Sequence, residues 1–278
     1  MSAAYDPATE TARQYYNSDD ADTFYAEVWG GEDIHIGLYE SPGEPIGEAS
    51  HRTVRHLADR LTRIDKSSVV LDIGSGYGGA ARDLAKRIGC RVIGLNLSEA
   101  ENDRHRQLNR QAGLADRIEV IDGRFEDIPL EDESVDAVWS QDAILHSGDR
   151  ARVLSEVDRV LRPGGQFVFT DPMQADDCPP DVLEPILSRI HLPDLGSPNF
   201  YRDAAARLGW RDAGYESMTN QLVNHYTRVL ETTEARSDVL TDKISADYLT
   251  RMKAGLRHWI DGGKAGHLAW GVFLFEKP

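Results

Sequence analysis

Cysteine and long apolar segments are scarce in this sequence, and each scarcity excludes a class of protein. Cys90 and Cys178 are the only cysteines among 278 residues, so the chain can form one disulfide at most. Cys90 precedes a short apolar segment with the character of a buried strand, and we expect both thiols to remain reduced in the cytoplasm. No apolar run reaches the length of a membrane span, and residues 1–7 lack the basic and apolar character of a signal peptide. We therefore expect no membrane partner.

Positive charge is also scarce. The chain has 6 lysines and 25 arginines against 47 acidic residues, which gives a formal net charge of −16. This balance argues against nucleic acid or an anionic membrane surface as a partner. An acid-rich, lysine-poor surface is expected of a protein kept soluble in concentrated salt, and an ordinary acidic cytoplasmic enzyme is an equally good interpretation.

The stretch from Ser67 to Glu101 has the pattern of a β-α-β unit. Residues 69–73 form a short apolar run suited to a buried strand, and apolar residues recur at helical spacing over 80–88 before a second strand at 90–95. Between strand and helix, Gly74, Gly76 and Gly79 have the spacing G-x-G-x-x-G. Glycines here allow a sharp turn and close approach of a ligand to the main chain. The pattern predicts a nucleotide-type site at the first turn.

The residues flanking this loop argue against a dinucleotide. Asp72 lies two residues before the first glycine, where an anion would oppose a pyrophosphate but suits a ligand that carries an ammonium and a sulfonium. The second strand ends in Asn96, whereas dinucleotide sites usually have an acid at this position. A dehydrogenase is therefore disfavoured. The loop with its preceding acid resembles motif I of class I S-adenosylmethionine-dependent methyltransferases.

The fourth predicted strand, residues 134–140, delivers polar side chains to the carboxyl edge of the sheet. Ligands of open α/β sheets bind at this edge. Asp142 and His146 follow the strand, so we expect them where a transferred methyl group would emerge. Further strands are predicted at 117–121, 166–170, 213–219 and 268–275, with the Leu161–Gly165 segment as a turn in which Gly164 and Gly165 have positive φ.

Longer segments of the chain resemble the sarcosine/dimethylglycine N-methyltransferases of glycine betaine synthesis. The segments that carry the resemblance are Ala12–Ser18 (ARQYYNS), Trp29–Tyr39 (WGGEDIHIGLY), Trp139–Asp142 (WSQD), Phe169–Cys178 (FTDPMQADDC) and Pro198–Arg202 (PNFYR). Phosphoethanolamine N-methyltransferases and other small-molecule methyltransferases share the pattern more loosely and are the alternative. A binding protein without catalytic activity is a third possibility.

The resemblance implies an α/β, Rossmann-like class I methyltransferase fold. Its sheet is mostly parallel and seven-stranded with an antiparallel last strand. A helical lid and linker helix would occupy residues 1–61, within the same domain. The core would span 62–278, with helical substrate-chamber insertions at about 175–198 and 221–263. The expected reaction is in-line transfer of a methyl group from S-adenosylmethionine to sarcosine and dimethylglycine, giving S-adenosylhomocysteine and glycine betaine. No metal is implied, and a cytoplasmic monomer or dimer is expected.

The same resemblance, together with the position of the sheet edge, assigns candidate site residues. The candidate catalytic residues are Tyr16, Asp142 and His146. The candidate cofactor-binding residues are Tyr25, Trp29, Ile34, Gly37, Asp72, Gly74, Gly76, Asn96, Leu97, Arg124, Phe125 and Gln141. The candidate substrate-binding residues are Trp29, Pro172, Met173, Gln174, Tyr201, Arg202, Tyr226 and Arg228.

Methylation of an amine to a quaternary ammonium sets the chemistry of the substrate site. Aromatic faces suit the growing positive charge, and Tyr16, Tyr25, Trp29, Tyr201 and Tyr226 are candidates for such a lining. The substrate carboxylate requires a cluster of donors, for which Arg202, Arg228, Gln174 and His146 are candidates. His146 or a tyrosine could relay the proton, and binding of the neutral amine is the alternative.

The net charge predicts that salt stabilises the fold. Repulsion within a chain of formal charge −16 weakens the compact state at low ionic strength, and added salt screens that repulsion. We expect the melting temperature to rise when potassium chloride is added, measured by calorimetry at constant pH. A flat or falling trend would remove the argument for adaptation to salt.

Overall fold

The computed structural model describes residues 10, 13, 17–29, 31–190 and 192–278. Its centre is a seven-stranded sheet in the order β3-β2-β1-β4-β5-β9-β7. The strands are β1 (Val69–Ile73), β2 (Arg91–Asn96), β3 (Ile118–Asp122), β4 (Val135–Gln141), β5 (Leu161–Thr170), β7 (Arg211–Ser217) and β9 (Gly271–Glu276). Neighbouring strands from β3 to β5 are parallel, whereas β9 is antiparallel to both β5 and β7. The predicted mostly parallel sheet with an antiparallel last strand is confirmed.

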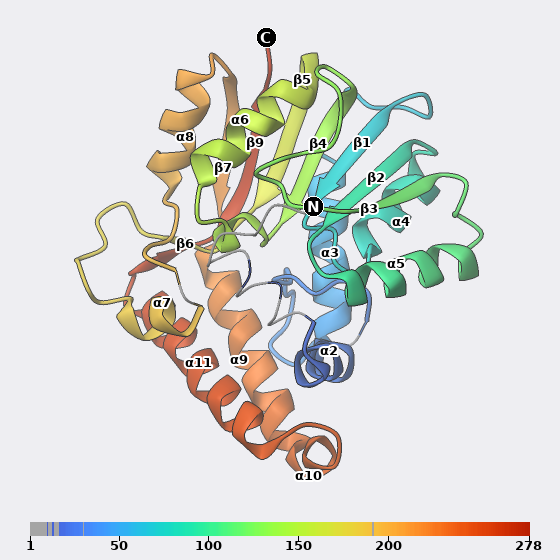
Figure 1. The fold of residues 1–278 in the computed structure, drawn as a ribbon. Helices are drawn as coiled ribbons and strands as arrows, with labels where there is room; N and C mark the ends of the chain where they lie inside the picture. The colour runs from blue at the N-terminus through green and yellow to red at the C-terminus, as the bar shows by residue number, and fades with distance from the viewer. Residues whose placement is uncertain (1–9, 11–12, 14–16, 30, 191) are drawn as a thin grey trace.

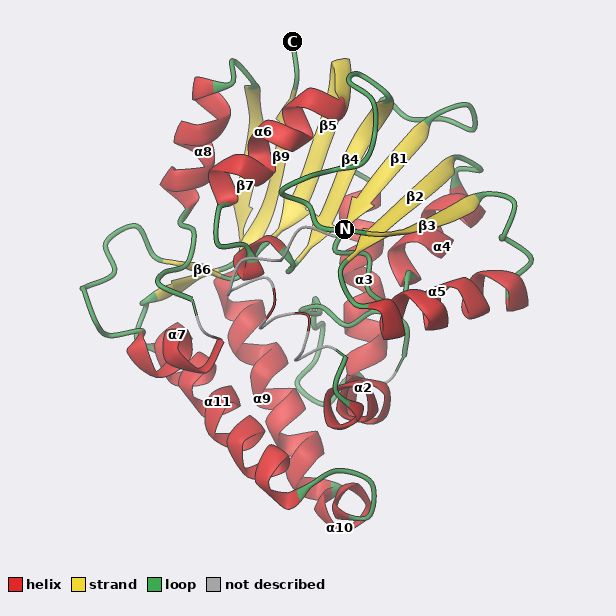
Figure 2. Cartoon of the chain, viewed as in Figure 1, coloured by secondary structure: helices red, strands yellow, loops and turns green. Residues whose placement is uncertain are grey.

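Helices cover both faces of this sheet (Figure 2). On one face α3 (Ile46–Ala58) and α4 (Gly79–Arg87) bury apolar side chains against β1, β2 and β4. On the other face α6 (Arg150–Val160) and α8 (Pro198–Arg207) do the same against β4, β5 and β9. The remaining core helix, α5 (Glu99–Gln111), packs beside β2 and β3. The parallel strands are thus buried on both faces, which explains their continuous apolar sequences.

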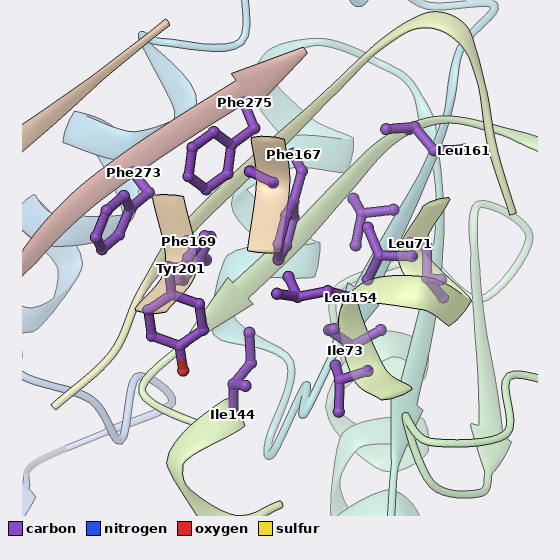
Figure 3. Close-up of a cluster of buried hydrophobic side chains, with 14 of the residues drawn as sticks. Leu71, Ile73, Ile144, Leu154, Leu161, Phe167, Phe169, Tyr201, Phe273 and Phe275 are labelled. Atoms are coloured by element: carbon purple, nitrogen blue, oxygen red, sulfur yellow. The ribbon is translucent and has the colours of Figure 1, made fainter. Parts of the chain in front are cut away.

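Stacked aromatic rings fill the core on the α8 side (Figure 3). Phe169 stacks on Phe167 and on Phe273 at centroid distances of 4.6 and 4.9 Å. Tyr201 of α8 meets Phe169 edge to face at 5.0 Å and is fully buried. Its hydroxyl donates a 2.6 Å hydrogen bond to Asp171 Oδ2. A buried tyrosine needs such a partner, so Tyr201 belongs to the core.

A helical lobe lies beyond the carboxyl ends of the parallel strands (Figure 1). It contains α2 (Asp19–Phe24), the π-helix η1 (Tyr25–Trp29), α7 (Glu184–Ile190), α9 (Thr219–Ala235), α10 (Ser237–Thr241) and α11 (Ala246–Lys264). The N-terminal block and the C-terminal helices share one apolar cluster, in which Phe24, Val28 and Trp29 pack with Val229, Tyr248 and Leu256. Segments more than 200 residues apart in sequence therefore form one cover over the sheet edge.

The structure corrects two local predictions. Leu161–Gly165 begins β5, and only Gly164 of the two glycines has a positive φ, at 78°. Gly165 is required for packing, because a Cβ there would lie 2.6 Å from Leu161 Cδ1. The last predicted strand is interrupted at Trp270 into β8 (Leu268–Ala269) and β9, and β8 pairs with β6 (Met173–Gln174) in a separate two-stranded sheet.

Across the described part of the chain, every helix is too short or too polar to cross a membrane.

His225 on α9 attaches the segment that follows η1 to the helical lobe. Its Nδ1 accepts a hydrogen bond from the Gly37 N–H at 3.1 Å and lies 2.9 Å from the Tyr39 hydroxyl. Burial, with a smaller contribution from His35, lowers the pKa of His225 to about 3. A neutral ring with its lone pair on Nδ1 fits both contacts.

The depressed pKa of His225 predicts a loss of stability in acid. Its folded pKa lies below the ordinary value near 6.5, so the unfolded state binds an extra proton between about pH 3 and 6.5. Wild type should lose up to about 3 kcal/mol from this group between pH 7 and pH 4. Asparagine in His225→Asn keeps a hydrogen-bond acceptor but cannot titrate. The difference in free energy of unfolding between wild type and variant, measured by urea unfolding, should therefore become smaller as the pH falls from 7 to 4. His258→Asn, at an exposed position, is the control for the loss of a histidine. If the difference in free energy of unfolding between wild type and His225→Asn does not change with pH, the prediction is contradicted.

Candidate active site

Two hollows meet where the carboxyl edge of the sheet faces the helical lobe. The larger, here called the chamber, has a volume of about 740 Å³ and lies among η1, η2 (Ile144–His146), α7, α9 and α11. The narrower one, here called the loop hollow, has a volume of about 90 Å³ and lies at the ends of β1, β2, β3 and β4. Ile34, Asp142 and His146 line both. A ligand in the loop hollow can therefore present a group to a second ligand in the chamber.

The glycine loop forms the floor of the loop hollow. Gly74, Gly76 and Gly78 have φ values of 76°, 49° and 76°, and Gly78 is the N-cap of α4. A Cβ at Gly74 would lie 2.3 Å from Ala143 Cβ, so the loop between β1 and α4 and the loop after β4 pack too closely for any side chain. All three positions favour glycine by their positive φ, and Gly74 requires it for space as well.

Most of the predicted cofactor residues lie around this hollow. The ones that line it are Ile34, Gly74, Gly76, Asn96, Leu97, Arg124, Phe125 and Gln141. Gln141 offers a donor there, because its Oε1 accepts from Trp139 Nε1 at 3.1 Å while its buried Nε2 has no hydrogen-bond partner among the described residues. An unpartnered buried donor of this kind is expected where a polar ligand binds.

Glu101 is a site residue that the sequence analysis did not assign. Ser98 and Glu101 have capping-box spacing, and Ser98 Oγ accepts from the Glu101 N–H at 3.2 Å. The Glu101 side chain instead points to Asn96, whose Nδ2 donates to Glu101 Oε2 at 2.9 Å, and it lines the loop hollow. Burial raises the pKa of Glu101 to about 7. Asn96 and Glu101 together form an amide–carboxyl pair able to bind a diol.

Asp72 lies beneath the glycine loop. Burial, together with the charge of Asp33, raises the pKa of Asp72 to about 7. Asp72 Oδ2 and Asp33 Oδ1 are both buried without a hydrogen-bond partner among the described residues. Asp33 also lies at the start of α4, since a Cβ on Gly79 would fall 1.9 Å from its Oδ1. Two adjacent, incompletely bonded carboxyl groups suit a cationic group such as an ammonium.

Aromatic side chains from three helices line the chamber. Tyr25 and Trp29 come from η1, with ring centroids 4.9 Å apart, and Tyr226 of α9 stacks on Trp259 of α11 at 5.4 Å. Tyr248 of α11 completes this lining. A π-helix is rare and is frequent at functional sites. The rings present faces suited to a cation.

Asp142 is held at both carboxylate oxygens. Its Oδ2 accepts from the Ile36 N–H at 2.7 Å and its Oδ1 accepts from the Trp270 Nε1–H at 2.8 Å. Its φ of 51° lies in the left-handed region that aspartate tolerates better than most residues. These two bonds join the 33–39 segment to the sheet edge. Each oxygen can accept a further hydrogen bond and Asp142 lines both hollows, so its catalytic role stays a prediction.

His146 lies between the two hollows. Burial, followed by the positive charges of Arg150 and Arg189, lowers the pKa of His146 to about 4. The imidazole is therefore neutral at neutral pH and can accept a hydrogen bond.

Of the predicted catalytic residues, Tyr16 falls outside the described residues.

Three further predicted residues lie outside both hollows. Gly37 packs on α3, where a Cβ would lie 2.7 Å from Ala49 Cβ, and its N–H is bonded to His225. Met173 is fully buried, and Gln174 pairs with Leu268 in the small sheet. Their neighbour Pro172 does line the chamber. Met173 and Gln174, which pair with β8, are thus absent from the chamber lining.

The predicted carboxylate-binding arginines also lie elsewhere. Arg202 forms a 2.9 Å ion pair with Asp212 and is exposed, whereas the neighbouring Tyr201 is buried. Arg228 forms a 2.6 Å ion pair with Glu231 and lies among the residues behind Trp29, outside the chamber. The chamber instead contains Arg189 of α7 and Arg251 of α11. Helical spacing alone could not show which face of α7 or α11 meets the chamber.

Comparison with known proteins supports one family. Residues 71–169 match the family described as a methyltransferase domain. The sarcosine/dimethylglycine N-methyltransferase of Halorhodospira halochloris is 55% identical over 278 residues, which cover 100% of both chains. A structure from Galdieria sulphuraria, assigned as a sarcosine dimethylglycine methyltransferase, has a TM-score of 0.90 at 45% identity and covers 95% of this chain and 98% of that one.

A more distant structure shares the fold. A Haemonchus contortus phosphoethanolamine N-methyltransferase 2, in complex with phosphomonomethylethanolamine and S-adenosylhomocysteine, has a TM-score of 0.84 at 20% identity. The similarity covers 99% of this chain and 61% of that one.

The loop hollow predicts that a methyl group at Gly76 weakens binding of S-adenosylmethionine. Gly76→Ala and Gly113→Ala both place a side chain at positive φ, 49° and 69°, and should each lose about 1–2 kcal/mol of stability. Only Gly76 lines the loop hollow, whereas Gly113 has open space around it. Overpacking costs about 1–3 kcal/mol, so affinity by calorimetry should fall about 5- to 150-fold for Gly76→Ala alone. Equal affinities in the two folded variants would contradict the assignment.

Proposed function

This chain belongs to the sarcosine/dimethylglycine N-methyltransferase family of S-adenosylmethionine-dependent enzymes, and from that membership we propose that it methylates sarcosine and N,N-dimethylglycine to glycine betaine. The observation that carries the proposal is the junction of the two hollows at Ile34, Asp142 and His146, with the glycine loop on one side and aromatic rings on the other.

The loop hollow is proposed to hold the cofactor. S-adenosylmethionine, when bound, supplies a methyl group on a positively charged sulfur. Asn96 and Glu101 would bind its ribose hydroxyls, and Arg124 and Phe125 would lie along the adenine. Asp72 and Asp33 would attract its ammonium, which offsets the repulsion between the two carboxyl groups.

The chamber is proposed to hold the amine. Each methyl group added makes the ammonium larger and less strongly hydrated, and the rings of Tyr25, Trp29 and Tyr226 can then receive it. Cation–π contacts contribute about 0.5–2 kcal/mol each. Positioning the amine lone pair in line with the methyl group is the other contribution, since well-oriented reactants can lower a barrier by about 7–11 kcal/mol.

His146 is proposed to orient the amine as a hydrogen-bond acceptor. Its pKa of about 4 makes it a poor base for an alkylammonium with an ordinary pKa near 10.4. The gap of about six pKa units corresponds to about 8 kcal/mol. The substrate must therefore lose its proton on entering the aromatic chamber, where burial favours the neutral amine. His146 can then accept from the remaining N–H of sarcosine.

A parallel assay of substrates tests the proposed function. Labelled methyl transfer should be measured from S-adenosylmethionine to glycine, sarcosine, dimethylglycine, dimethylethanolamine and phosphoethanolamine. We expect turnover of sarcosine and dimethylglycine, little of glycine and almost none of the ethanolamines. Efficient methylation of phosphoethanolamine without turnover of dimethylglycine would instead support the phosphoethanolamine class.

A further inference from the structure

Arg189 stands out among the charged residues of the chamber. It lies on α7 and is partly buried, and among the described residues it has no carboxylate within ion-pair distance. Its guanidinium Nη2 contacts Met252 Sδ at 3.3 Å. Most other arginines of this acidic chain are paired with an acid, as Arg251 is with Asp247 at 3.2 Å. A guanidinium in a chamber wall without an anion is an available anion receptor.

The acids of the chamber wall do not compete for this guanidinium. Both oxygens of Asp142 are bound by Ile36 and Trp270. Asp20 accepts from the main-chain N–H and the hydroxyl of Ser245. Asp19 lies in the exposed first turn of α2. The receptor therefore remains open to an anion that enters the chamber.

A slot on α11 fixes the position of Arg189. A Cβ on Gly255 would lie 2.5 Å from Arg189 Nε and 2.7 Å from its Cδ and Cζ, so the arginine lies directly against the glycine. Met252, three residues earlier on the same face of α11, also contacts the guanidinium. Glycine inside a helix is about 1 kcal/mol less favourable than alanine. The slot gives a physical reason for glycine at this position.

Arg189 lines the same chamber as His146. Its charge is one of the causes of the lowered pKa of His146, which lines both hollows. In a glycine derivative one methylene separates the amine from the carboxylate. A carboxylate on Arg189 therefore keeps the amine in the chamber, where His146 forms part of the wall.

We propose that Arg189, held in the slot formed by Gly255 and Met252, binds the substrate carboxylate and selects amino-acid amines over ethanolamine-type amines. The proposal rests on the proposed function, since it names the receptor for the substrate of that reaction. A planar guanidinium can bind both oxygens of a carboxylate, whereas a neutral hydroxyl gains much less from the same contact.

Kinetics of Arg189→Met, with Arg251→Met as the matched control, test this role. Both arginines line the chamber, but Arg251 is exposed and paired with Asp247. Loss of a charged hydrogen bond should raise the KM for dimethylglycine about 10- to 150-fold in Arg189→Met. The value of kcat should change little, because the carboxylate is bound equally in ground and transition states. Affinity for S-adenosylmethionine and the small rate with dimethylethanolamine should be unchanged.

Gly255→Ala provides a second, independent variant. The added methyl group should displace Arg189 from its slot while leaving the guanidinium in the protein, and alanine favours the helix. We expect KM for dimethylglycine to rise in this variant too, with the melting temperature maintained. Arg189→Lys should recover part of the loss, because it restores the charge without the fork.

The outcomes separate this proposal from the proposed function. Absence of dimethylglycine turnover in wild type would contradict the function itself. Turnover in wild type with an unchanged KM in folded Arg189→Met, or an equal rise in Arg251→Met, would overturn the role of Arg189. If Arg189→Met fails to fold by circular dichroism, Gly255→Ala decides: an unchanged KM there overturns the proposal, and a raised KM supports it.

Discussion

The carboxylate of Asp142 joins three distant parts of the chain. It follows β4, binds the main chain of the 33–39 segment through Ile36, and binds the indole of Trp270 between β8 and β9. Burial raises the pKa of Asp142, so an unpaired carboxylate at this position would be costly, and the two N–H donors offset that cost. The boundary between the loop hollow and the chamber depends on these bonds. Loss of either donor would leave the carboxylate incompletely bonded and release one wall of both hollows.

The two hollows differ in their electrostatics. Buried polar groups with unmet hydrogen-bonding capacity lie around and beneath the loop hollow, among them Asp72, Asp33 and Gln141. The chamber instead presents rings, a neutral histidine and the Arg189 guanidinium. The first environment suits a polar ligand with an ammonium, and the second suits a small zwitterion whose amine must be neutral to react. The same fold thus separates the recognition of an ammonium group at the loop hollow from that of an amine and its carboxylate in the chamber.

The fold and the loop hollow could be predicted because their signals are local. Gly74 and Gly76 are required by backbone conformation, and Val69–Ile73 is apolar because both faces of β1 are buried. The chamber could not be predicted in the same way. Its arginine depends on the relative rotation of α7 and α11, which tertiary packing determines, so Arg202 and Arg228 were equally plausible from sequence. The sequence showed Glu101 only as one residue of a capping-box pattern. The hydrogen bond between its side chain and Asn96 could be seen only in the structure.

Gly255 also has a consequence for the evolution and engineering of this chain. Selection for helix stability alone favours alanine at an interior helical position, and substitutions toward the best helix former are a common route to thermostable variants. At this position such a change would occupy the space in which the Arg189 side chain lies. Helix propensity and substrate selection therefore act in opposite directions on a single methyl group, and a stabilising design that ignores the neighbouring helix would choose the wrong residue here.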